Sequence, residues 1–134
     1  MYISETTVRV RYAETDKMNY VYYGNYAQYY EIGRVEALRQ LGISYRSIEE
    51  QGFMLPVHTM SSKFIRPAQY DDLLIIKTTI KELPSTRIYF KYEIFNEKSE
   101  LLNEGETTLV FVNMKTNRPT TAPEFILEKF KKLF

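Results

Sequence analysis

The clearest pattern in the chain is an alternation of apolar and polar positions over residues 87–95. Ile88, Phe90, Tyr92 and Ile94 form the apolar set, and Arg87, Tyr89, Lys91 and Glu93 lie between them. A two-residue period places each set on one face, so the segment is predicted to be a strand with one covered face. β patterns also predict strands over about residues 3–12, 54–65, 73–81 and 104–113. In the first of these, Val8, Val10 and Tyr12 alternate with Arg9 and Arg11.

A helical period replaces the alternation over residues 24–41. Projected at about 100° per residue, the apolar and small side chains of this segment share one wide arc. Gly33 and Ala37 are small enough to let a sheet approach the helix closely, and Gly42 supplies the usual C-terminal stop. The arc comprises Tyr26, Ala27, Tyr30, Gly33, Ala37, Leu38 and Leu41.

Two shorter helices are predicted at segments with capping patterns. The first covers about residues 44–51, where Ser47 and Glu50 have capping-box spacing, and Gly52 ends it. The second starts near Pro123, with Thr121 and Glu124 spaced as another capping box. Its apolar stripe comprises Ile126, Phe130, Leu133 and Phe134.

The order of these elements is a strand, a long helix, four consecutive strands and a terminal helix. Turn-forming residues at 83–86 and 96–99 predict hairpins between neighbouring strands. Segregated helices and strands indicate an α+β fold with an antiparallel sheet rather than a βαβ nucleotide-binding fold. The length and the absence of a linker or repeat predict one domain over residues 1–134.

Composition and charge narrow the classes of function. The 18 Lys and Arg residues nearly balance 17 Asp and Glu, and the net charge of +1 argues against a nucleic-acid-binding protein. The absence of cysteine excludes disulfides, thiol nucleophiles and thiolate metal sites. His58 is the single histidine, so we expect no metal site and place it at a surface or interface. The sequence shows neither a membrane span nor a signal peptide, so a cytoplasmic location is expected.

Asp16 lies in a polar loop, just before the long helix, and it is the first candidate for chemistry. The first amides of a helix have no intrahelical partner and carry the positive end of its dipole, so they can polarise a carbonyl. A carboxylate opposite them could attack that carbonyl or activate water. The alternative is that Asp16 is only a turn residue, a common place for aspartate.

A resemblance to a known family favours the catalytic interpretation. Residues 9–26, RVRYAETDKMNYVYYGNY, are similar to the signature of the hot-dog fold acyl-CoA thioesterases. The closest group is the 4-hydroxybenzoyl-CoA thioesterase-like branch, which includes the bacterial Tol-Pal-associated thioesterases. The similarity continues through EIGRVE (31–36), residues 41–42, FMLPV (53–57), FIRPAQYDD (64–72), EGET (104–107) and residues 118–119. The family fold, a sheet wrapped around one long helix, agrees with the predicted element order.

The resemblance implies a role for each of two residues. Asp16 is in the position of the catalytic carboxylate, as a nucleophile or as a general base toward water. The backbone N–H of Tyr23 is in the position that polarises the thioester carbonyl. Many relatives have histidine in place of Tyr23 and glycine in place of Asn19. The backbone N–H at position 23 is present with either side chain, so tyrosine in place of histidine keeps the donor. Asparagine tolerates a left-handed backbone better than most residues, so Asn19 in place of glycine lets the loop keep its shape.

Other candidates have weaker support. Arg34 falls within the apolar arc, and Glu31 at i−3 is predicted to be its partner, either in a structural ion pair or as an auxiliary acid or base. The cluster Tyr22, Tyr26, Tyr29 and Tyr30 has the spacing of a buried helix face, with one or two rings reaching the acyl site. For Arg66, next to Pro67, we expect a structural role. Ser85, Arg87 and Arg118 are candidates for binding the phosphates of coenzyme A.

The resemblance predicts an acyl-CoA thioesterase with no metal or redox cofactor. It also implies a homodimer with active sites at the subunit interface, commonly paired into a homotetramer. Two alternatives stay open: a thioesterase acting on acyl carrier protein, and a non-catalytic acyl-CoA-binding domain. A dehydratase of the same fold is disfavoured, because such enzymes typically use a histidine with a carboxylate and His58 lies outside that context.

Overall fold

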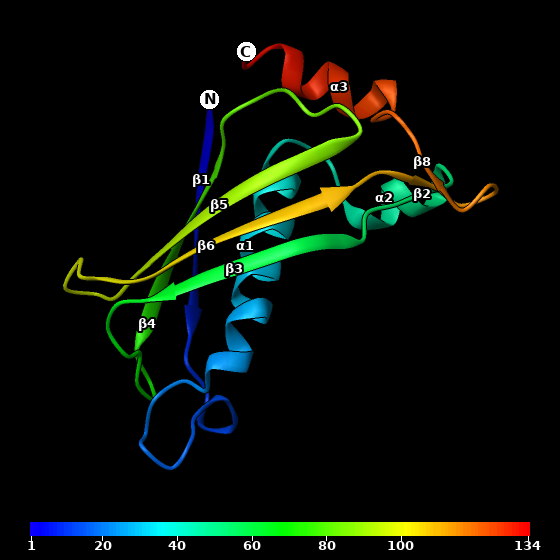
Figure 1. Ribbon diagram of the computed structural model, residues 1–134. Coiled ribbons are helices and arrows are strands. Elements are labelled where there is room, and N and C mark those ends of the chain that lie inside the picture. Colours follow the sequence, from blue (N-terminus) through cyan, green and yellow to red (C-terminus); the bar gives the residue numbers. More distant parts are fainter.

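A five-stranded antiparallel sheet wraps around one long helix in the computed structural model, which describes residues 1–134 (Figure 1). The helix, α1, spans Tyr26–Gln40 and directly follows the 3-10 helix η2 at Tyr23–Asn25. The strand order in the sheet is β1-β4-β5-β6-β3. The strands are β1 (Tyr2–Arg9), β3 (Val57–Phe64), β4 (Leu73–Ile80), β5 (Arg87–Phe95) and β6 (Leu101–Val110). The predicted α+β architecture is confirmed.

Smaller elements complete the fold. A second, three-stranded sheet has the order β2-β7-β8. The remaining elements are the 3-10 helix η1 (Tyr12–Glu14), α2 (Tyr45–Glu50), β2 (Phe53–Met54), β7 (Val112–Asn113), β8 (Arg118–Pro119) and α3 (Glu124–Lys131). No helix of the chain is both long enough and apolar enough to cross a membrane.

The packing of α1 on the sheet explains the pattern in β5. Ile88, Phe90, Tyr92 and Ile94 are all buried, as the alternation predicts. Gly33 allows the close approach, because a Cβ there would lie 2.7 Å from Thr78 Oγ1 and 2.8 Å from Ile76 Cγ2. The prediction that a small residue brings helix and sheet together is therefore confirmed at Gly33.

Several boundaries differ from the sequence-based prediction. The first strand ends at Arg9, and Tyr12 lies in η1 with 76% of its surface exposed. The segment predicted as one strand over residues 54–65 is two strands, β2 and β3, separated by Leu55 and Pro56. Ala27, predicted to lie in the apolar arc of α1, is exposed. The first difference arises where the chain leaves the sheet, and the second where Pro56 interrupts the β-ladder.

Both predicted capping boxes are wrong. Ser44, rather than Ser47, caps α2: its side chain accepts a hydrogen bond from the Ser47 amide at 3.1 Å, and the Ser47 hydroxyl accepts one from the Ser44 amide. The N-cap of α3 is Pro123, and no side chain caps that helix. Ile126 and Phe130 of the predicted apolar stripe are buried, whereas Phe134 is exposed.

Tyr30 packs against the backbone of β6 at a point where only glycine fits. A Cβ added at Gly105 would overlap the Tyr30 ring and its hydroxyl. The Tyr30 ring stacks on Tyr92 with centroids 4.5 Å apart, so it cannot move away without disturbing the core. Tyr30 also ties α1 to the edge strand β3, because its hydroxyl shares a 2.8 Å hydrogen bond with Ser62 Oγ.

Gly105→Ala is therefore expected to lower the free energy of unfolding by about 1–3 kcal/mol, the usual cost of overfilling a packed core. Chemical denaturation measures this change. In a Tyr30→Leu background the same glycine substitution should cost less, because the clashing ring is gone. An equal penalty in both backgrounds would show that the Tyr30 contact is not the cause.

Candidate active site

The loop before α1 holds the Asp16 side chain in a defined position. Asp16 Oδ1 accepts hydrogen bonds from the backbone amides of Met18 at 2.8 Å and Tyr20 at 3.3 Å. The backbone of Asp16 adds two more bonds, to the Tyr20 carbonyl at 2.8 Å and from the Asn19 amide at 3.0 Å. These contacts leave Asp16 Oδ2 without a hydrogen-bond partner in the chain. One carboxylate oxygen is thus fixed and the other is available to a ligand.

Asn19 makes this tight loop possible. Its φ of 64° lies in the left-handed region, which asparagine tolerates better than most residues. The left-handed backbone predicted to be tolerated at Asn19 is thus present.

Neighbouring segments fix the loop to the rest of the fold. Short antiparallel bridges join Thr15 to Val21 and Tyr20 to Gln69, so the loop pairs with the segment between β3 and β4. The Glu14 carbonyl accepts a 2.9 Å hydrogen bond from the Tyr22 amide, and the Glu14 carboxylate accepts one of 2.9 Å from the Tyr29 hydroxyl. Burial, and then this contact with Glu14, raises the pKa of the Tyr29 phenol, which therefore stays neutral.

Tyr23 begins the helical segment and presents a free amide. The preceding residue, Tyr22, is extended with φ −61° and ψ 132°, and the chain turns into η2 at Tyr23. No carbonyl or side chain of the protein accepts a hydrogen bond from the Tyr23 amide, as expected for the first amide of a helix. Tyr23 itself is 67% exposed.

Asp16 and Tyr23 line the same cavity. Its volume is about 370 Å³, and seven of its ten lining residues are apolar. Phe64, at the end of β3, packs edge-on against Tyr23 with ring centroids 6.5 Å apart and an interplanar angle of 86°. The cavity is lined by Asp16, Met18, Tyr20, Val21, Tyr23, Tyr26, Phe64, Ile65, Arg66 and Pro67. The arrangement combines a carboxylate, an unpaired amide and an apolar wall.

Arg66 is a residue of this cavity to which the sequence analysis gave only a structural role. It does make a structural contact, because its Nη1 lies 2.8 Å from Glu100 Oε2. It also lines the cavity that holds Asp16. The Arg-Pro dipeptide was visible in the sequence, but no local signal showed that it would fold against the Asp16 loop.

The candidates for coenzyme A phosphates do not line the Asp16 cavity. Ser85 and Arg87 lie where the β4–β5 connection enters β5, and the Ser85 carbonyl accepts a 2.8 Å hydrogen bond from the Ala122 amide. Arg118 lies in β8 of the small sheet. All three residues are exposed. His58 is also exposed, on the edge strand β3.

The predicted ion pair between Arg34 and Glu31 is absent. Arg34 is buried, but its Nε donates a 3.1 Å hydrogen bond to the Tyr45 hydroxyl, whereas Glu31 is exposed. Burial raises the pKa of Tyr45 in spite of the nearby guanidinium, so the acceptor is a neutral phenol. Glu31 lies at i−3 from Arg34 on the same helix, but the actual partner, Tyr45, belongs to α2, which the pattern of α1 alone could not show.

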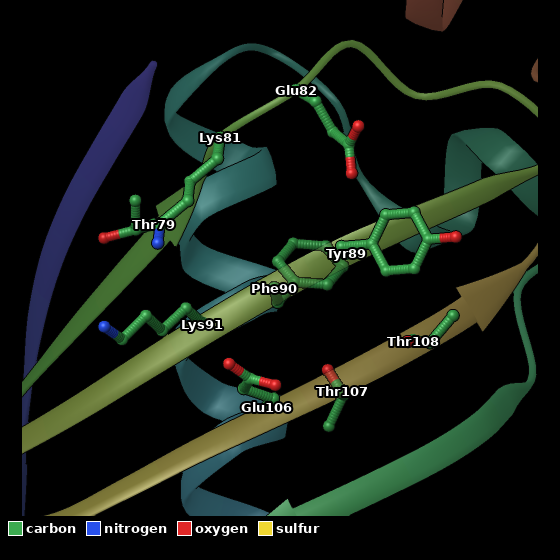
Figure 2. Close-up of a pocket in the computed structure, with 9 residues that line it drawn as sticks. All are labelled: Thr79, Lys81, Glu82, Tyr89, Phe90, Lys91, Glu106, Thr107 and Thr108. Atoms are coloured by element: carbon green, nitrogen blue, oxygen red, sulfur yellow. The ribbon is translucent and has the colours of Figure 1, made fainter.

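Another cavity, of about 210 Å³, opens over β4, β5 and β6 (Figure 2). Its charged side chains are two lysines, Lys81 and Lys91, and two glutamates, Glu82 and Glu106. Lys91 and Glu106 are directly opposed on neighbouring strands. The charges balance, so this cavity offers no strong attraction for a polyanion, and it shares no residue with the Asp16 cavity.

Comparison with known proteins identifies the family. The family model described as "Thioesterase-like superfamily" matches residues 10–130, which include the Asp16 loop, α1 and the whole sheet except β1. The chain belongs to the thioesterase-like superfamily. The sheet wrapped around α1 is therefore the hot-dog fold that the family resemblance implies.

Individual relatives in the family support the same assignment. The chain is 34% identical to the acyl-CoA thioester hydrolase YbgC of Escherichia coli O6:H1 over 124 residues, 92% of each chain. It is 29% identical to the putative acyl-CoA thioesterase YneP of Bacillus subtilis, over 89% of this chain and 86% of the relative. A crystal structure of DHNA-CoA thioesterase from Staphylococcus aureus superposes with a TM-score of 0.93 at 35% identity, covering 99% of this chain and 91% of that one.

Proposed function

We propose that this chain hydrolyses an acyl-CoA thioester to the free acid and coenzyme A at the cavity that contains Asp16. The observation that carries the proposal is that Asp16, whose carboxylate has one free oxygen, and Tyr23, whose helix-start amide is unpaired, line one largely apolar cavity. The thioesterase-like relatives, named for acyl-CoA hydrolysis, support the reaction class.

The proposed mechanism assigns opposite electronic roles to the two groups. The thioester carbonyl oxygen accepts a hydrogen bond from the Tyr23 amide, which stabilises the negative charge that develops on this oxygen during attack. Asp16 either attacks the carbonyl carbon, forming a mixed anhydride that water then hydrolyses, or removes a proton from an attacking water. In both routes the C–S bond breaks and the coenzyme A sulfur leaves as a thiolate, which takes up a proton.

The distal end of coenzyme A requires cations for its phosphates. Ser85, Arg87 and Arg118 remain the proposed ligands, at a distance from the thioester because none of them lines the Asp16 cavity. Ser85 lies in the turn before β5, Arg87 in β5 and Arg118 in β8, and all three are exposed. A flexible nucleotide that extends over the surface could contact such positions.

A homodimer, or a homotetramer built from dimers, is the proposed assembly in the cytoplasm. β3 supports it as the candidate interface, because it is an edge strand with only β6 as a neighbour. Its exposed apolar side chains are Val57, Met60 and Phe64, which are 47%, 50% and 52% exposed. An unpaired edge with apolar side chains favours pairing with a second strand. Because Phe64 also lines the Asp16 cavity, such pairing would bring the second subunit beside the site.

The test is release of free thiol by the purified chain from acyl-CoA substrates and from matched acyl carrier protein thioesters. The proposal expects turnover of at least one acyl-CoA, with a larger kcat/KM than for the same acyl group on the carrier protein. A preference for the carrier protein would point to the first alternative. Binding of acyl-CoA without turnover would indicate a non-catalytic domain.

A further inference from the structure

The floor of the Asp16 cavity is made by two residues, Val21 and Tyr26. They are the buried members of its lining, with 5% and 3% of their surfaces exposed. Tyr26 lies in the first turn of α1, and its ring packs edge-on against Phe64 with centroids 5.2 Å apart. Burial raises the pKa of Tyr26 to about 12, so the phenol is neutral. The contact with Phe64 shows that the Tyr26 ring reaches from α1 to the end of β3.

The space behind Tyr26 is filled and polar. The Tyr29 ring packs edge-on against Tyr26 at 5.6 Å, and the Tyr29 hydroxyl donates to Glu14. The Tyr30 hydroxyl, one turn along α1, donates to the side-chain oxygen of the fully buried Asn103 and is also paired with Ser62. An alkyl chain entering this region would have to displace close-packed rings and break hydrogen bonds, both of which cost free energy.

The other lining residues of the cavity are half-buried or exposed, so Val21 and Tyr26 set its inner limit. Above the floor, the exposed rings of Tyr23 and Phe64 form its aromatic rim. A group that reaches Asp16 therefore meets aromatic surface on its sides and a closed wall beneath.

From this geometry we propose that Tyr26 limits the size of the acyl group, so that the substrate is a compact acyl-CoA, carrying a short aliphatic chain or a single ring. This inference rests on the proposed function. Tyr26 acts here as a specificity-determining residue that contacts the far end of the acyl group, and long fatty acyl chains are excluded.

The test compares kcat/KM for butyryl-CoA, octanoyl-CoA and palmitoyl-CoA in the wild-type protein and in two variants. Wild type should prefer butyryl-CoA over palmitoyl-CoA by at least ~10-fold, since apolar pockets discriminate by about that much for small size differences. Tyr26→Leu, which shortens the side chain, should raise the octanoyl-to-butyryl ratio at least ~10-fold. Tyr26→Phe, which keeps the ring, should retain the wild-type ratio. A general loss of structure would lower both rates and leave their ratio unchanged.

The outcomes separate the two proposals. No turnover of any acyl-CoA by wild type would overturn the proposed function and this inference with it. Turnover with palmitoyl-CoA as the best substrate would overturn the size limit alone, and this result needs no variant to fold. Turnover with an unchanged ratio in a folded Tyr26→Leu variant would also overturn the inference alone.

Discussion

Asp16→Asn is expected to lower kcat for acyl-CoA hydrolysis by at least ~100-fold while the fold persists. An amide oxygen can still accept the hydrogen bonds from the Met18 and Tyr20 amides, so the loop should keep its shape. The amide can neither attack the thioester nor take a proton from water. Steady-state release of free thiol measures the loss, and thermal unfolding checks that the structure is retained.

Asp71→Asn provides the matched control. Asp71 is an exposed aspartate with φ 67°, in the loop that pairs with the Asp16 segment. Its side chain makes only a 3.9 Å ion pair with Arg9, and its hydrogen bonds to Arg9 and Val10 use backbone atoms that the substitution keeps. The chemical change is the same, and asparagine tolerates the left-handed backbone. Its kcat should match wild type. Near-normal turnover in the Asp16 variant as well would contradict the catalytic assignment.

Tyr23→Pro is expected to lower kcat by about 10²–10³-fold, the usual effect of removing one oxyanion-hole donor. Proline lacks the N–H but favours the first position of a helix, so the start of η2 should survive. The extended conformation of Tyr22, with ψ 132°, is the one that a following proline requires. The substitution therefore removes the amide hydrogen with little other change, and kcat from thiol release reports its contribution.

Tyr23→Ala separates the amide from the phenol. It keeps the backbone donor and removes only the side chain, so it should cost far less activity than Tyr23→Pro. If a well-folded Tyr23→Ala variant lost as much activity as Tyr23→Pro, the phenol would be the important group and the proposed role of the amide would be wrong.

The fold was largely predictable because its main elements follow local periods. The alternation in β5 predicts a strand with one covered face, and α1 packs on that face. Gly33 predicts a close contact between helix and sheet, and the structure has it. The predictions failed where the period continued but the chain direction changed. Alternation up to Tyr12 suggested a strand, although β1 ends at Arg9 and the chain then turns into η1. Which serine caps α2 depends on where the helix starts, which the Ser47-to-Glu50 spacing alone did not show.

The site was only partly predictable, because it is built from segments far apart in the sequence. The family resemblance pointed to Asp16 and Tyr23, and the structure places both in one cavity. The bridge between Tyr20 and Gln69 holds the segment that contains Arg66 against the Asp16 loop, and no local pattern in the sequence predicts this contact. Arg34 was assigned a partner within its own helix, whereas the actual partner, Tyr45, comes from α2. The surroundings of Arg66 and Arg34 both depend on contacts between segments far apart in the sequence.

The most direct test of the account is the infrared spectrum of an acyl-CoA with an isotopically labelled thioester carbonyl, bound to the slow Asp16→Asn variant. A hydrogen bond from the Tyr23 amide polarises this carbonyl, so its stretching frequency should fall below that of free acyl-CoA, and the shift should disappear when Tyr23→Pro is added. An unshifted carbonyl in the bound Asp16→Asn complex, or a shift that persists without the Tyr23 amide, would contradict the account.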